Sequence, residues 1–262
     1  KSTYISLKDS SVVTTGNNSA GTAVSARAMM KVENSTVSTT GDSSPAIMIA
    51  DGGGILIADG GSFTTSGAMS QGIYSKGDVT VTNASVNALN AKAAVLKGNN
   101  TITLSGTILE GKETADTIPY NIVLFSDEKD IGTMGTQHFD VRGGSLISHK
   151  GGMFYVTATH GKISLNGTAI TMDDPAANLI TVAGNDGANG WGTPGRNGGH
   201  VELVADNQVL TGNISVDFIS NINMTLKNNS TFNGMISIVP NTEGGEKYKT
   251  NADVFIAAGS TW

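Results

Sequence analysis

A short apolar pattern recurs along most of this chain, and its spacing constrains the fold more than any other feature. The pattern is an apolar residue, any residue and a second apolar residue, then two residues, a small residue and a further apolar one. The first five copies start 25, 25, 24 and 23 residues apart, so the basic period is about 24 residues. Seven clear copies and three looser ones start at Ile5, Met30, Ile55, Val79, Ile102, Phe139, Ile163, Val201, Met224 and Val254.

Each repeat predicts three short strands. Alternation of apolar residues at a period of two places one side of a strand inward, as for Ile55 and Ile57 in the third copy. The residue before the small one is Asp, Asn or Gly in all seven clear copies, and these types occupy left-handed backbone at the lowest cost. We therefore expect a one-residue bend there, with positive φ at Asn34, Asp59 and Asn83. A second apolar patch follows each bend and supplies the third strand.

Three strands in each repeat, with no helical segment, predict one rung of a parallel β-helix. Rungs stack at about 4.8 Å and bury their inward side chains against neighbouring rungs. The expected fold is all-β: a single right-handed parallel β-helix of about ten rungs over residues 1–262, as one domain. The alternative is a β-sandwich with a strand every 8–12 residues or so, but a sandwich does not require the same turn residue at one offset.

Three insertions interrupt the period, at about 110–135, 184–199 and 240–251. Insertions between the repeats of a solenoid become loops on one face, which is often the binding face. The sequence therefore predicts that these segments leave the rod together.

Composition excludes several classes of protein. The formal net charge is -6 and the chain has 16 Lys and Arg residues, too few to neutralise many phosphates, so no nucleic acid is expected as a partner. No apolar run approaches the roughly 20 residues of a membrane span. Since the chain has no Cys, disulfides and thiolate zinc sites are excluded, and we expect neither a cofactor nor a metal ion.

The chain resembles bacterial adhesin-like surface proteins in four features. These are the period, the Asx and Gly bends, the segment Trp-Gly-Thr-Pro-Gly-Arg-Asn-Gly-Gly at 191–199 and the stretch 210–232. Those proteins are right-handed parallel β-helices, similar in shape to autotransporter passengers and pectin lyases, and the resemblance covers nearly the whole chain. It implies a non-enzymatic extracellular protein, on a bacterial cell surface or secreted, that contacts a glycan or a surface protein. It also implies a segment of a longer protein, in which the rung ending at Trp262 leaves an open edge.

The shape shared with pectin lyases makes a polysaccharide lyase or glycoside hydrolase the alternative function. Polygalacturonase-like enzymes carry Asn-x-Asp, paired Asp, His-Gly and Arg-x-Lys in that order. Here His160-Gly161 precedes Asp173-Asp174, and no Arg-x-Lys exists, so the Asp pair is better explained as a turn. The acidic run 127–130 is explained by a solvated loop rather than by a calcium site. We therefore predict no catalytic residue.

Two further patterns involve the histidines and the threonines. The histidines lack metal-ligand spacing, and His149 and His160 either meet within one rung or lie separately on the surface. A pair of hydroxyl residues recurs on three consecutive rungs, beginning at Thr14, Thr39 and Thr65, and predicts a ladder of hydroxyls that faces solvent. Three rungs are fewer than the flat threonine arrays of ice-binding β-helices contain.

The candidate ligand-binding residues are Trp191, Arg196 and Asn197, in the most glycine-rich stretch of the chain. Trp191 lacks the alternating neighbours of a core tryptophan, and a flat aromatic face beside planar polar groups suits a sugar ring or a peptide side chain. The alternative is that Trp191 packs the loop onto the rod, with its indole N–H bonded locally.

Overall fold

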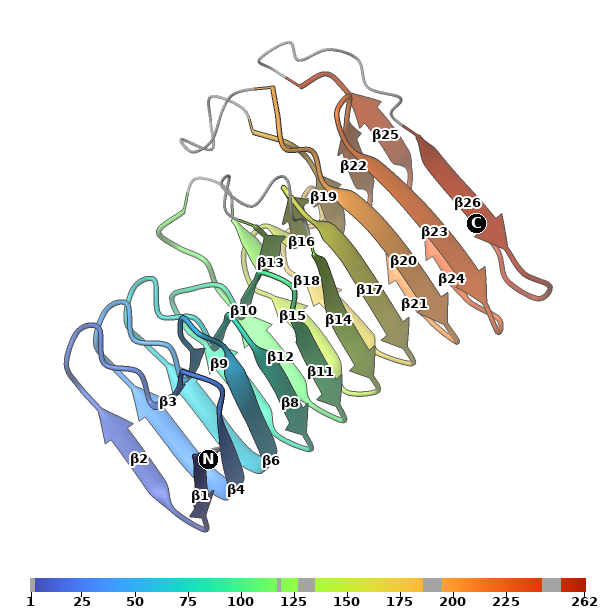
Figure 1. Cartoon of the computed structure of the whole chain (residues 1–262). Coiled ribbons are helices and arrows are strands. Elements are labelled where there is room, and N and C mark those ends of the chain that lie inside the picture. Colours follow the sequence, from blue (N-terminus) through green and yellow to red (C-terminus); the bar gives the residue numbers. More distant parts are fainter. Residues whose placement is uncertain (1–2, 117–118, 127–134, 186–194, 242–250) are drawn as a thin grey trace.

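The computed structural model describes residues 3–116, 119–126, 135–185, 195–241 and 251–262. Its strands wind into a right-handed parallel β-helix, which confirms the predicted fold class. The described strands complete nine turns and begin a tenth, close to the ten rungs expected. Figure 1 shows these turns advancing from the blue end to the red end of the chain. No described segment forms a helix with the length and hydropathy needed to cross a bilayer.

Three sheets run along the rod, and β4 and β6 pass through a bend and so contribute to two of them. The first sheet contains β1 (Tyr4–Lys8), β4 (Ala28–Thr39), β6 (Gly54–Thr65), β8 (Asp78–Thr82), β11 (Thr101–Ser105), β14 (Thr136–Arg142), β17 (His160–Asn166), β20 (His200–Asp206), β23 (Asn221–Lys227) and β26 (Ala252–Ile256). The second contains β2 (Ser11–Thr14), the ends of β4 and β6, β9 (Ser85–Ala88), β12 (Ile108–Gly111), β15 (Ser145–Ser148) and β18 (Ala169–Met172). The same side of the rod continues with β21 (Val209–Thr211) and β24 (Thr231–Asn233), which pair with each other in a separate two-stranded sheet. The third contains β3 (Thr22–Val24), β5 (Ile47–Ile49), β7 (Ile73–Ser75), β10 (Ala94–Lys97), β13 (Tyr120–Phe125), β16 (Gly152–Thr157), β19 (Ile180–Val182), β22 (Ile214–Asp217) and β25 (Ile236–Val239).

The core is a column of apolar side chains inside the three sheets. Inward residues of one turn pack on the inward residues of the next, because equivalent positions pair in register. Phe139 and Phe154 approach edge to face within this column, with ring centroids 5.7 Å apart. The side chains of Phe63, Phe139, Phe154 and Phe232 are the largest that are fully buried.

The bend between the first and second sheets has the left-handed backbone that the sequence predicts. The φ angles are 44° at Asn34 and 50° at Asn83, so both of these predictions are confirmed. The prediction for Asp59 is wrong, because the bend of that turn falls on Gly60, at φ 70°. Glycine enters this region without a Cβ clash, and the neighbouring strand aligns Asn34 with Gly60.

The one-residue difference also reverses the inward face predicted for this turn. Met30 pairs with Leu56, so Leu56 and Ala58 lie fully buried in the core. Ile55 points outward and is 38% exposed, and Ile57 is only half-buried. The expectation that Ile55 and Ile57 face inward is therefore wrong, since a slip of one residue exchanges the two faces of a strand.

The first predicted insertion contains a strand that the sequence reading missed. Tyr120–Phe125 forms β13 and supplies the third-sheet strand of its turn, within a segment assigned to a loop over 110–135. The connections 126–135, 183–199 and 240–251 all lead from the third sheet to the first, at every second turn. The attachment points of these three connections therefore share one corner, as expected, whereas 112–119 of the first predicted insertion lies between the second and third sheets.

The predicted solvent-facing hydroxyl ladder is only half correct: Thr15 and Thr40 are exposed, whereas the first residue of each pair faces inward. Thr39 and Thr65 are 1% and 0% exposed. They lie two residues after the inward Val37 and Phe63, and alternation returns them to the same side. The Thr39 hydroxyl donates to the carbonyl of Ser44 at 2.6 Å, and Thr14 donates likewise to Ser19 at 2.8 Å. These hydroxyls satisfy turn carbonyls inside the rod.

Candidate functional site

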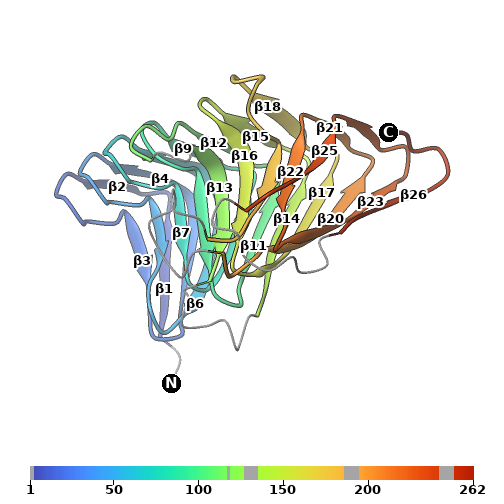
Figure 2. The ribbon, with the colours of Figure 1, turned by 90° about the horizontal axis from the view of Figure 1, so that it is seen from above.

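The outward side of the first sheet carries the larger of two adjoining hollows. It spans β11, β14, β17, β20 and β23, which lie side by side in Figure 2. Alternation turns every second side chain of these strands toward solvent, and register aligns them in rows across the sheet. The hollow has a volume of about 490 Å³. Its outward side chains are Thr103, Ser105, Asp140, Arg142, Ser164, Asn166, Val204, Asp206 and Lys227.

One carboxylate in the larger hollow is held by its neighbours. Asp206 accepts a hydrogen bond of 2.7 Å from Asn228 Nδ2 and pairs with Lys227 Nζ at 3.4 Å. The hydrogen bond from Asn228, supported by Lys227, holds the pKa of Asp206 below its usual range. Asp206 therefore stays ionised and serves as a fixed acceptor.

Asp140 and Arg142 are two further charged residues in this hollow. They lie two positions apart on β14 and project from the same side of the sheet. Among the described residues, neither side chain has a hydrogen-bond or ion-pair partner. Arg142 is exposed. The guanidinium donors and carboxylate acceptors are thus available to a ligand lying in the hollow.

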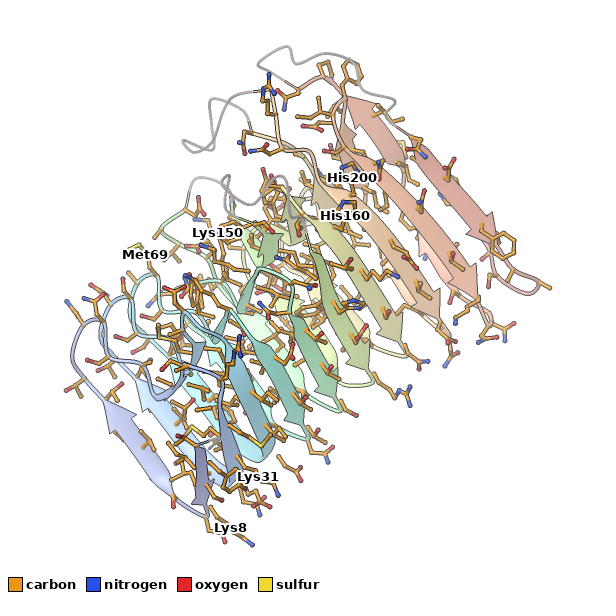
Figure 3. The ribbon with its side chains drawn as sticks, viewed as in Figure 1. Lys8, Lys31, Met69, Lys150, His160 and His200 are labelled. Atoms are coloured by element: carbon orange, nitrogen blue, oxygen red, sulfur yellow. The ribbon has the colours of Figure 1, made fainter. Side chains whose placement is uncertain are left out.

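The smaller hollow, of about 310 Å³, lies toward the starts of the same strands. His160 and His200 stack there with ring centroids 4.8 Å apart, and both are labelled in Figure 3. Burial, and then the neighbouring His200, lowers the pKa of His160. Asn221 Nδ2 lies 2.7 Å from His200 Nδ1, and Lys162 pairs with Glu202 at 3.0 Å.

The corner with the long connections adjoins this smaller hollow, because β14 and β20 begin there. A buried carboxylate fixes the bases of two of these connections. Asp217 Oδ2 accepts hydrogen bonds from Gly184 N at 2.8 Å and from Asn241 Nδ2 at 2.9 Å. The Asn241 amide also donates to the carbonyl of Asn185 at 3.2 Å. These bonds position the chain where it leaves and rejoins the rod.

The predicted ligand-binding residues are divided between described and undescribed parts of the chain. Trp191 lies outside the described residues. Arg196 is exposed, and its carbonyl accepts a hydrogen bond of 2.8 Å from Asn185 N. Asn197 is half-buried at φ 63°, and its carbonyl accepts from Ala158 N at 3.0 Å. Both residues belong to the base of the second connection, a few residues before His200 in the sequence.

His149 directly follows β15, at the end of a strand of the second sheet. His149 Nδ1 is 2.8 Å from Asp173 Oδ2, and His149 Nε2 is 3.8 Å from Glu110 Oε2. His149 and His160 therefore have separate partners, and Asp173 lies in the turn after β18, as predicted. Within the described ranges, no three His, Asp or Glu side chains are grouped to hold a metal ion. The acidic run 127–130 lies outside those ranges.

Sequence reasoning missed most of the two hollows. Asp140, Arg142 and Lys227 alternate with core residues, and this period of two was the only available signal that they face outward. Nothing in their own spacing indicates that they meet, because Arg142 and Lys227 come from strands separated by an insertion. Neither a protein-family model, nor a curated protein, nor a solved structure matches this chain.

Proposed function

We propose that this protein is a non-enzymatic extracellular rod of the adhesin type, on a bacterial surface or secreted, that binds glycan chains along the outward side of its first sheet. The repeat pattern and the β-helix support the comparison with adhesins. The observation that carries glycan binding is the larger hollow, whose lining mixes hydroxyl, amide, carboxylate and guanidinium groups. Such groups form the donor and acceptor pairs that sugar hydroxyls require.

The long-connection corner is proposed as a second contact surface on the same rod, for a glycan or a surface protein. It contains the loop with Trp191, Arg196 and Asn197. Its attachment points lie at the edge of the first sheet, so a ligand along that sheet reaches them. If Trp191 contacts the ligand, Trp191→Ala abolishes binding and leaves the melting temperature nearly unchanged. A large fall in melting temperature with binding intact would identify Trp191 as a packing residue.

Glycan array binding combined with substitutions tests the larger hollow. We expect Arg142→Ala to weaken binding of the best glycan by at least about tenfold, because it removes a charge-assisted donor. Lys8→Ala is the matched control, since Lys8 occupies the same row of the first sheet five turns earlier. Equal effects of the two substitutions, or no glycan binding at all, would contradict the proposal.

Polysaccharide cleavage is the second candidate function, and the presence of Asp140 and Asp206 in one hollow is the observation that favours it. Glycoside hydrolysis needs one carboxyl group protonated as the acid and another as base or nucleophile. Asp206 is held ionised and suits the role of base or nucleophile, and Asp140 is the other carboxyl group in the hollow. A depolymerisation assay on every bound polysaccharide decides between the functions. Product formation that Asp140→Asn abolishes would establish the enzyme and overturn the non-enzymatic proposal.

A further inference from the structure

The smaller hollow is lined by two of the chain's four histidines, His160 and His200, on the outward side of the first sheet. His160 pairs in register with His200, and His138 pairs with Lys162 on the adjacent strand. Figure 3 labels His160 and His200 together above the starts of β17 and β20. His160 and His200 therefore form a stacked pair, although 40 positions separate them in the sequence.

The charged side chains that line this hollow balance each other. The Asn221 amide nitrogen contacts His200 Nδ1 at 2.7 Å. Lys162 and Glu202 neutralise each other through their 3.0 Å ion pair. The facing side chains of β23 in this hollow, Asn221 and Asn223, are uncharged.

Acidification changes the charge of the hollow strongly. Protonated His160 adds its charge to that of Lys162 against the single carboxylate of Glu202, and Asp140 lies further along β14 in the adjoining hollow. The His160 ring lies 4.8 Å from the His200 ring, and an anion placed beside this pair offsets the cost of placing a charge on His160 there. We propose that the smaller hollow is an acid-activated binding site for the carboxylate or sulfate group of an anionic glycan.

Linkage supports this proposal. In the empty hollow, burial and His200 lower the pKa of His160, so protonation is unfavourable without a ligand. An anion that binds beside protonated His160 must raise that pKa and must bind more tightly as the pH falls. The proposal rests on the proposed glycan binding, because it names the charge of the glycan and the pH at which this part of the sheet binds it.

A glycan suits the hollow better than an acidic protein does. Protein interfaces have a core rich in aromatic and other apolar side chains. Here the lining consists of histidines, one ion pair, Thr136 and two asparagines, with Gly161 and the inward Val201 as its other members. Its hydroxyl and amide groups continue the polar surface of the larger hollow, which gives an extended chain a continuous path along the sheet.

Titrations at about pH 5 and about pH 7.5 test the site with three probes: an oligogalacturonate, a sulfated dextran and an uncharged dextran. We expect at least one anionic probe to bind about tenfold more tightly at the lower pH, and the uncharged dextran to show no gain. His160→Gln with His200→Gln should abolish the gain. His149→Gln is the matched control, since His149 follows a strand of the second sheet, and should retain it. Circular dichroism at both pH values checks that each variant is folded.

Each other outcome overturns the proposal. A gain that persists in the double variant places the acid-dependent site elsewhere. An equal gain for the uncharged dextran removes the role of ligand charge, and a gain for poly-glutamate alone identifies the wrong class of ligand. If glycans bind at both pH values without any gain, this inference fails while the proposed function stands. If no glycan binds at either pH, both fail.

Discussion

A single backbone position decides where each turn of the rod bends. Asn83 occupies it at φ 50°, whereas Asp59, one position before the equivalent Gly60, has ordinary strand geometry. We expect Asn83→Ala to lower the free energy of unfolding by about 1 kcal/mol, because a Cβ-bearing residue without a side-chain amide is strained there. The exposed Asp59→Ala should change it by less than about 0.5 kcal/mol. Urea unfolding measures both, and equal losses would show that the bend imposes no such requirement.

The connections between strands depend on buried ion pairs as well as on bends. Lys92, before β10, pairs with Glu113 at 3.1 Å and with Asp116 at 2.9 Å, and so ties the segment after β12 to the preceding turn. Glu113 is 4% exposed. Lys92→Met should destabilise the protein by about 3 kcal/mol, because it leaves a buried carboxylate without its cation. Lys92→Met with Glu113→Leu should recover part of that loss, and a double variant less stable than the single would contradict this account.

The strands themselves were largely predictable, whereas their faces and neighbours were predictable only in part. Alternation identified the strand around Val32 because its flanking residues are polar enough to distinguish the two sides. It failed at Ile55–Ala58, because four successive apolar residues do not indicate which alternate residues face inward. Only the pairing with β4 determines that face. The hollows escaped prediction because their residues meet through register across an insertion, and a single strand carries no information about its neighbour.

At the scale of the whole molecule, we expect pH to change the free energy of unfolding through His160. His160 has a lowered pKa in the folded chain, so the unfolded chain takes up the proton more readily. Stability is therefore complete above the unfolded-state value near 6.5 and falls as the pH drops toward the lower folded-state pKa. We expect the unfolding free energy to decline between about pH 7.5 and about pH 5, and His160→Gln to remove part of that decline. Identical pH profiles for the two proteins would contradict this assignment.

The long connections enter the rod only at alternate turns of one corner, between β13 and β14, β19 and β20, and β25 and β26. The intervening turns pass the same corner by short links, such as Ala158–Thr159, so neighbouring attachment points stand about 10 Å apart. Each connection therefore has two turns of the rod to itself at this corner. We expect that its length can change without disturbing the stacking of the strands. We therefore expect these three connections to tolerate changes of length independently of one another. A short foreign peptide placed at 186–194 should be tolerated far better than one placed between Ala158 and Thr159, as soluble yield and melting temperature would show.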